Sequence, residues 1–284
     1  MEKHYSAWNE SEHLQTFSDY ALDLPIYTRY RNQARFHNLG RCLKKVLPFS
    51  ESVVEVGVGG GRSYTFFDAL RREMGYKSQY RGYDISPQCV EYCQKRFGDF
   101  FDISTTTSPK YQNADLLFFF DVLVHSAHPR DFLDSVCEST KKFLCFQTPT
   151  RDNGSTVYNP DQSCRLENGK WVPWIVFNIN ELIEELQKRG FDKFLVIKKY
   201  KKFAGNAPRF LPREFFEPNT GSSRTSVLAI RENSLVDEIT SDQEMANDVN
   251  VIVSTPGPSV PYGVALLNSV YRRVIASKKR YTTV

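Results

Sequence analysis

The sequence predicts a doubly wound α/β fold, a mostly parallel β-sheet with helices on both faces. Short apolar runs typical of buried strands alternate with segments of helical periodicity. One run, DLLFFFD at 115–121, is apolar between two acids, as expected of a strand covered on both faces. Glycines follow the first of these strands, where the chain must turn directly into a helix.

Apolar residues recur at helical spacing from Tyr30 to Val46 until Pro48 interrupts them, which predicts one or two helices ahead of the sheet. Ser86 is expected to cap a later helix, and Gly190 to end another. The strands expected are 52–58, 80–83, 100–103, 115–121, 143–147, 194–198 and 226–230, and the helices between or after them are 63–74, 87–97, 130–140, 180–189 and 262–277.

Three parts of the chain follow from this pattern. Residues 1–47 are expected to form an N-terminal helical lid, 48–231 a ligand-binding domain, and 232–284 a linker with a C-terminal helical extension. Two insertions in the domain, at 148–176 and 201–223, lack periodicity and contain proline and glycine, so we assign them to substrate binding. The extension is a candidate homodimer contact.

Composition narrows the class of protein. Apolar residues make up 40% and charged residues 25%, values typical of a globular protein. The net charge of +4 and the absence of a concentrated basic stripe argue against a specific nucleic-acid binder. Two short basic runs, at 198–202 and 278–280, are interpreted as solvated surface rather than phosphate-binding patches.

No apolar stretch approaches a signal peptide or the roughly 20 residues of a membrane-spanning helix, so we expect no membrane association. The six cysteines show no zinc-site spacing and are expected to be free, buried thiols in a reducing cytoplasm. No His/Asp/Glu cluster has ligand spacing, so no metal is expected.

The strongest motif is VVEVGVGGGRS at 53–63, which contains E-x-G-x-G-x-G between a predicted strand and a helix. Glycines let the backbone approach a ligand, and the helix N-terminus supplies free N–H donors. Asp84 ends the next strand, 27 residues after Gly57, where an acid can accept hydrogen bonds from ribose hydroxyls.

The spacing differs from the G-x-G-x-x-G of dinucleotide sites and from the G-K-[ST] of phosphate loops. Glu55 lies two residues before the first glycine, and a carboxylate there suits a positively charged amino-acid group better than a pyrophosphate. S-adenosylmethionine carries an ammonium and a sulfonium and no phosphate.

The segments EVGVGGGRS, GYDISPQCVEYCQKRF and ADLLFFFDVLVHSAHPRDFLDSV resemble successive motifs of the class I S-adenosylmethionine-dependent methyltransferases. The resemblance covers about residues 50 to 150. It implies a Rossmann-like, seven-stranded, mostly parallel sheet with an antiparallel final hairpin, and S-adenosyl-L-methionine as cofactor.

The positions that match the family's cofactor-binding residues are Glu55, Gly57, Gly59, Gly61, Asp84, Ile85, Asp102, Asp121 and Val122. By resemblance, the first four contact the methionine half. Asp84 holds the ribose, Ile85 packs on the adenine and Asp102 contacts the adenine amino group. Asp121 and Val122 face the cofactor.

His125 lies just past the fourth strand and is the candidate general base, with His128 as a weaker alternative. Either histidine is equally compatible with a packing or capping role. Aromatic and basic residues proposed to contact the substrate are Tyr20, Tyr27, Trp171, Trp174, Arg209 and Arg213; ordinary packing or surface ion pairs explain them as well.

The function expected is methylation of a small molecule, with oxygen favoured as the acceptor atom, in a sugar or glycan precursor or a secondary metabolite. The N-P-P-[YF] tetrapeptide of enzymes that methylate amide or base nitrogens is absent. Two alternatives stay open: a non-catalytic binding or regulatory protein that kept the fold, and an RNA or protein methyltransferase.

Overall fold

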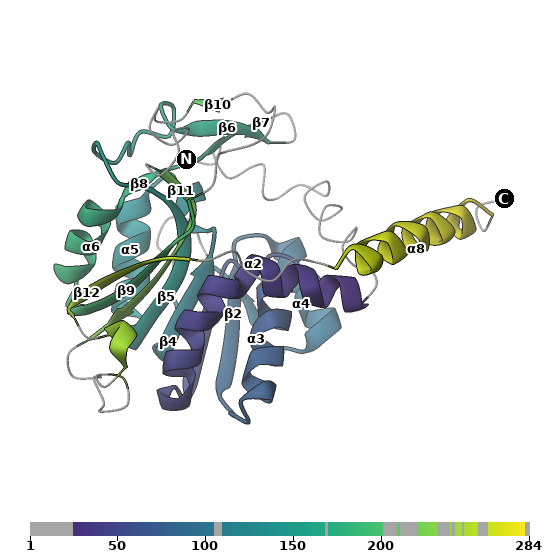
Figure 1. The fold of residues 1–284 in the computed structure, drawn as a ribbon, viewed down its shortest axis with the longest axis horizontal. Helices are drawn as coiled ribbons and strands as arrows, with labels where there is room; N and C mark the ends of the chain where they lie inside the picture. The colour runs from purple at the N-terminus through teal and green to yellow at the C-terminus, as the bar shows by residue number, and fades with distance from the viewer. Residues whose placement is uncertain are drawn as a thin grey trace.

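The computed structural model describes residues 25–104, 110–167, 170–200, 209–210, 221–231, 239, 242–245, 247–254 and 261–281. Nine strands form its main sheet, in the order β12-β9-β11-β5-β4-β1-β2-β3 with β8 beside β5 (Figure 1). Their bounds are β1 Ser52–Val56, β2 Gln79–Asp84, β3 Phe101–Ile103, β4 Ala114–Phe120, β5 Thr140–Arg151, β8 Phe177–Asn178, β9 Lys193–Lys198, β11 Gly221–Ile230 and β12 Val249–Val253. Only β11 runs antiparallel to its described neighbours, β5 and β9.

Helices cover both faces of this sheet, as the sequence predicts. On one face lie α2 (Pro25–Val46), α3 (Arg62–Glu73) and α4 (Pro87–Phe97); on the other lie α5 (Pro129–Glu138) and α6 (Ile179–Gln187) (Figure 1). Successive side chains of a strand point to opposite faces of the sheet. Because helices cover both faces, β4 is apolar from Leu116 onward. Its Leu116 and Phe118 pack with α2 and α3, and its Leu117 and Phe119 with α5.

The doubly wound fold class is confirmed, with two strands more than the seven expected. β12 lies within the predicted linker and pairs with β9 in parallel. Buried Met245, in the short 3₁₀ helix η8 (Gln243–Met245), and ion pairs tie this segment to the domain. Arg41 contacts Glu244 at 2.5 Å, and Lys45 pairs with Asp242. The acidic composition that suggested a linker instead supplies partners for basic residues on α2.

The insertion at 148–176 is not wholly a loop. β5 continues to Arg151, and β6 (Cys164–Glu167) and β7 (Lys170–Pro173) form an antiparallel pair to which β10 (Arg209–Phe210) adds a third strand. The Ile175 N–H, just past β7, donates to the Val124 carbonyl at 2.8 Å. This small sheet is therefore fixed to the segment that follows β4.

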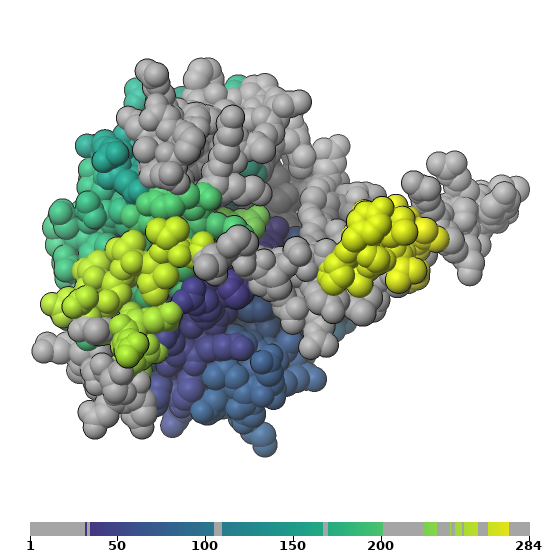
Figure 2. Space-filling view, viewed as in Figure 1, coloured from purple at the N-terminus to yellow at the C-terminus, as the bar shows by residue number. Residues whose placement is uncertain are grey.

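The C-terminal helix α8 (Tyr262–Tyr281) extends away from the sheet (Figures 1 and 2). Tyr262, Leu266 and Leu267 on it are exposed. The homodimer expected through this extension stays a prediction. Within the described part of the chain, no helix is both long and apolar enough to cross a membrane. All six cysteines are free and buried, as expected.

Candidate functional site

The glycine loop joins β1 to α3 and is held against the ends of two other strands. Gly57 has a φ of +76°, a left-handed conformation that favours glycine. The N–H groups of Gly57 and Val58 donate to the Tyr83 carbonyl of β2 at 2.7 and 3.1 Å. A Cβ on Gly57 would lie 2.2 Å from Cγ2 of Val122, which follows β4. The loop thus contacts the segment after β4 with no room for a side chain.

Gly61 serves packing within the domain. It precedes α3 with a φ of +73°, and a Cβ there would lie 2.4 Å from the Phe97 ring on α4. The close approach of α4 therefore requires glycine at position 61, independently of any bound ligand. The predicted contact of Gly61 with the cofactor stays a prediction, and so does that of Gly59, which also has a positive φ.

Glu55 is buried beneath this loop. The Ser63 hydroxyl donates to one of its carboxylate oxygens, and the Tyr80 hydroxyl donates to the other at 2.5 Å. Burial raises the pKa of Glu55 to about 7, against the opposing effect of these two hydrogen bonds, and the negative charge of Asp84 raises it further. Near neutral pH, Glu55 therefore sits between its neutral and charged forms.

Asp84 ends β2 and faces the glycine loop. Its carboxylate accepts hydrogen bonds from the N–H groups of Gly59, at 2.8 Å, and Ser86, at 2.9 Å. Burial raises the pKa of Asp84, and these backbone donors oppose the rise. Ile85 beside it is half-buried.

Asp102, the middle residue of β3, is more exposed than the other acids. Its partly exposed carboxylate pairs with Arg81 on β2. The predicted adenine contact of Asp102 is untested, and it would compete with this ion pair.

Asp121 follows β4 and has a φ of +54°, unusual for a residue with a side chain. Its N–H donates to the Gln147 carbonyl at 3.1 Å, and Nε2 of Gln147 donates to its carboxylate at 3.4 Å. A guanidinium nitrogen of Arg35 lies 3.6 Å from the same carboxylate. Burial raises the pKa of Asp121, and the charges of Arg35 and Arg224 oppose the rise.

His125 lies in the 3₁₀ helix η5 (Leu123–His125). Its Nδ1 is 3.0 Å from the Pro173 carbonyl oxygen. A carbonyl only accepts, so this contact assigns the proton of the neutral ring to Nδ1 and makes Nε2 its basic nitrogen. Trp174 packs edge-on against the ring, with centroids 5.2 Å apart. His128 is exposed at the start of α5.

The predicted substrate residues are only partly brought together. Trp174 lies against His125 and beneath the Arg165 guanidinium, which is 3.5 Å from the ring centroid. Trp171, on β7, is 44% exposed. Tyr20 and Arg213 lie outside the described residues, as do the side chains of Tyr27 and Arg209.

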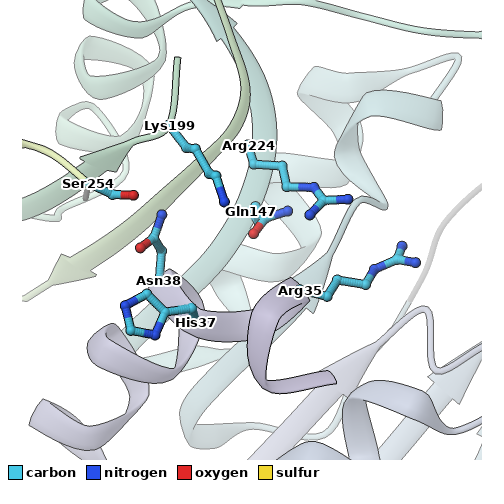
Figure 3. A pocket seen from close by; sticks show the side chains of 7 residues that line it. All are labelled: Arg35, His37, Asn38, Gln147, Lys199, Arg224 and Ser254. Atoms are coloured by element: carbon cyan, nitrogen blue, oxygen red, sulfur yellow. The ribbon is translucent and has the colours of Figure 1, made fainter. Parts of the chain in front are cut away.

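Sequence reasoning missed a small pocket (Figure 3), which lies beside Asp121 because Arg35 and Gln147 both line it and contact that carboxylate. The residues that line it are Arg35, His37, Asn38, Gln147, Lys199, Arg224 and Ser254. Interpreting the run at 198–202 as solvated surface is wrong for its first two lysines. Lys198 is buried and contacts Asp152 at 2.7 Å, and Lys199 lines the pocket. The one signal in the sequence was Gln147, a polar residue that ends the apolar run expected as a strand at 143–147.

Among the residues that the structure describes, no group of three or more His, Cys, Asp or Glu side chains is arranged to hold a metal ion.

Comparison with known proteins gives one family. The family described as "Methyltransferase domain" matches residues 27–195, more than half of the chain. No curated protein matches the sequence.

Many solved structures are similar to this chain, and three of them illustrate the likeness. A Thermotoga maritima S-adenosylmethionine-dependent enzyme, described as a possible histamine N-methyltransferase, is 20% identical over 73% of this chain and 99% of its own, with a TM-score of 0.42. The DhpI–S-adenosylhomocysteine complex is 13% identical over 82% and 99%, with a TM-score of 0.48. The CMeT domain of the citrinin polyketide synthase is 13% identical over 63% of this chain but only 45% of that one, with a TM-score of 0.42.

Proposed function

The chain belongs to the family of S-adenosylmethionine-dependent methyltransferases, and on that premise we propose that it methylates a hydroxyl oxygen of a small molecule. A sugar or glycan precursor, or a secondary metabolite, is the acceptor class that we favour. Its cofactor is S-adenosyl-L-methionine, which supplies a methyl group bonded to a positively charged sulfur. Free cysteines are consistent with a cytoplasmic location.

The residues at the carboxyl edge of the sheet fit this cofactor. Gly57 forms a cradle that a Cβ would fill, and no lysine of the phosphate-binding type follows the loop. Asp84 would accept hydrogen bonds from the ribose hydroxyls, and Ile85 would pack on the adenine. The charged form of Glu55 would attract the ammonium group of the cofactor, because Glu55 lies in β1 next to the same loop and accepts a hydrogen bond from Ser63 just after it.

The observation that carries the proposal is that the glycine loop contacts the segment after β4 through Gly57 and Val122. His125 lies three residues beyond Val122, and we propose it as the general base. Its Nε2 would take the proton of the acceptor hydroxyl, while bound S-adenosylmethionine would supply the methyl group and a sulfur leaving group. The Pro173 carbonyl orients the ring and stabilises the protonated imidazole through Nδ1.

Two measurements test this function. Calorimetry should detect S-adenosylhomocysteine binding with micromolar affinity, and methyl-labelled S-adenosylmethionine should label a low-molecular-weight fraction of a cell extract only when the protein is present. Transfer that requires the RNA or protein fraction would instead favour a macromolecular acceptor. Cofactor binding without transfer to any fraction would favour a regulatory protein.

A further inference from the structure

The pocket beside Asp121 lies where the core on the α2 face of the sheet changes from apolar to polar. Along β5, Phe143 and Cys145 belong to the core on this face, and Gln147 is the next residue of the same face. On β9, Ile197 belongs to this core and Lys199 is the next residue on the same face. On β12, Ile252 packs against the core and Ser254 is the next residue on that face. The polar side chains are therefore gathered by the strand register at one edge of the sheet.

Positive charge dominates the lining of this pocket. Arg35 from α2, Lys199 just past β9 and Arg224 from β11 all contribute, and none of the seven residues that the structure describes in the lining carries a carboxylate (Figure 3). Asp121 is the neighbouring acid. The pKa of His37, also in the lining, is lowered by burial and by the nearby charges of Arg41 and Lys199.

A buried amide points to a ligand independently of the charges. Asn38 lines the pocket, is only 6% exposed, and its Oδ1 has no hydrogen-bond partner among the described residues. Leaving a buried polar atom without a hydrogen bond is unfavourable, so nearly all such atoms have a partner. An asparagine amide can also turn to present its NH₂ group, which donates to an oxyanion.

We propose that this pocket binds the anionic group, a carboxylate or a phosphate, of the methyl acceptor. The inference rests on the proposed function. The pocket is small and its described lining is polar, so it suits one charged group rather than a whole ligand. Arg35 and Gln147 line the pocket and also contact Asp121. The residue after Asp121 is Val122, which packs against Gly57 of the glycine loop. An acceptor anchored here by its anion extends toward the site of methyl transfer.

The test uses the full chain with inorganic phosphate and, separately, acetate as probes. Melting temperature is followed against probe concentration at constant ionic strength, with and without saturating S-adenosylhomocysteine, and yields dissociation constants. The variant is the double substitution Lys199→Gln and Arg224→Gln, with each single substitution beside it in case the double variant does not fold. The control for each single variant is Lys193→Gln, which removes one positive charge at the opposite end of β9.

We expect the double variant to weaken binding of the preferred probe at least about tenfold, and the control to change it less than twofold. The stronger probe identifies the anion as phosphate or carboxylate. Equal affinities in wild type and double variant, or no response of the wild type to either probe, would overturn the inference. S-adenosylhomocysteine binding is scored separately in the same experiment, so its absence would count against the proposed function and not against the pocket.

Discussion

Two halves of one sheet edge carry opposite charge. At the ends of β1, β2 and β4 lie Glu55, Asp84 and Asp121, whereas beside β5, β9 and β11 the pocket presents Arg35, Lys199 and Arg224. The acids at Glu55 and Asp84 are held by hydroxyl and backbone N–H donors rather than by cations.

This difference suits a donor with positive charges and an acceptor with negative charge, brought together at a common border. Asp121 forms that border, because it contacts both Arg35 and Gln147 and is followed by Val122, which touches Gly57. We therefore expect the acidic half to bind the methyl donor and the basic half to bind the acceptor.

The largest effect is expected at His125, in the short helix η5 that follows Asp121. His125→Ala should lower turnover by roughly 10²–10⁴-fold and leave S-adenosylhomocysteine affinity nearly unchanged, because a general base acts on the acceptor and not on the cofactor. The pH–rate profile should lose its limb near neutrality. His128→Ala, at the exposed start of α5, is the control. Retention of more than about a tenth of the turnover would show that the base lies elsewhere.

Closing the glycine cradle should have the next largest effect. Gly57→Ala introduces a Cβ that would meet Val122 and forces a side chain into a left-handed backbone conformation, which together cost roughly 2–4 kcal/mol. Melting temperature and S-adenosylhomocysteine affinity should both fall. Adding Val122→Ala should recover part of the loss by removing the clash. No recovery would mean that backbone strain alone accounts for the effect.

A comparison of two acids sharpens the description of the donor half. Asp84→Asn should weaken S-adenosylhomocysteine binding by roughly 1–3 kcal/mol, because the ribose hydroxyls lose a charged acceptor. Asp102→Asn should cost less than about 1 kcal/mol, since its carboxylate is a partly exposed partner of Arg81. Calorimetry on both variants measures the difference. Equal losses of affinity in the two variants would show that Asp102 contributes as much to cofactor binding as Asp84 does.

A change of pH, without any substitution, should also alter the cofactor affinity. With a pKa of about 7, Glu55 is mostly protonated at pH 6 and mostly charged at pH 8, so S-adenosylhomocysteine should bind roughly tenfold more tightly at pH 8. Glu55→Gln should remove this slope, and Glu51→Gln, at an exposed position, should keep it.

The raised pKa of Glu55 also predicts that the stability of the unliganded protein falls as the pH rises, whereas its cofactor affinity increases. The folded state holds the Glu55 proton more tightly than the unfolded state does. Its contribution to stability is therefore fully present below pH 4.5 and is lost as the pH rises toward 7. A flat affinity profile together with this stability change would make Glu55 a structural residue only.

Local sequence determined most of the parallel half of the fold. The glycines at 57–61, the apolar run of β4 and the Ser86 cap before α4 each act over a few residues, so their elements could be predicted closely. The Ser86 hydroxyl accepts from the Cys89 N–H, as a cap should. Asp84 was found by its distance along the chain from the glycine loop.

Only the tertiary structure decided the other half of the edge. Arg35 and Arg224 lie 189 positions apart in the chain, and β12 comes from a segment whose composition suggests a linker. Their meeting depends on α2 crossing the sheet and on the pairing of β9 with β11 and β12, which no local pattern encodes. A lysine in a basic run looks solvated in sequence, but Lys199 lines a pocket because the register of β9 directs it there. Residues that act over a few positions could be predicted from the sequence, and those that meet only through packing could not.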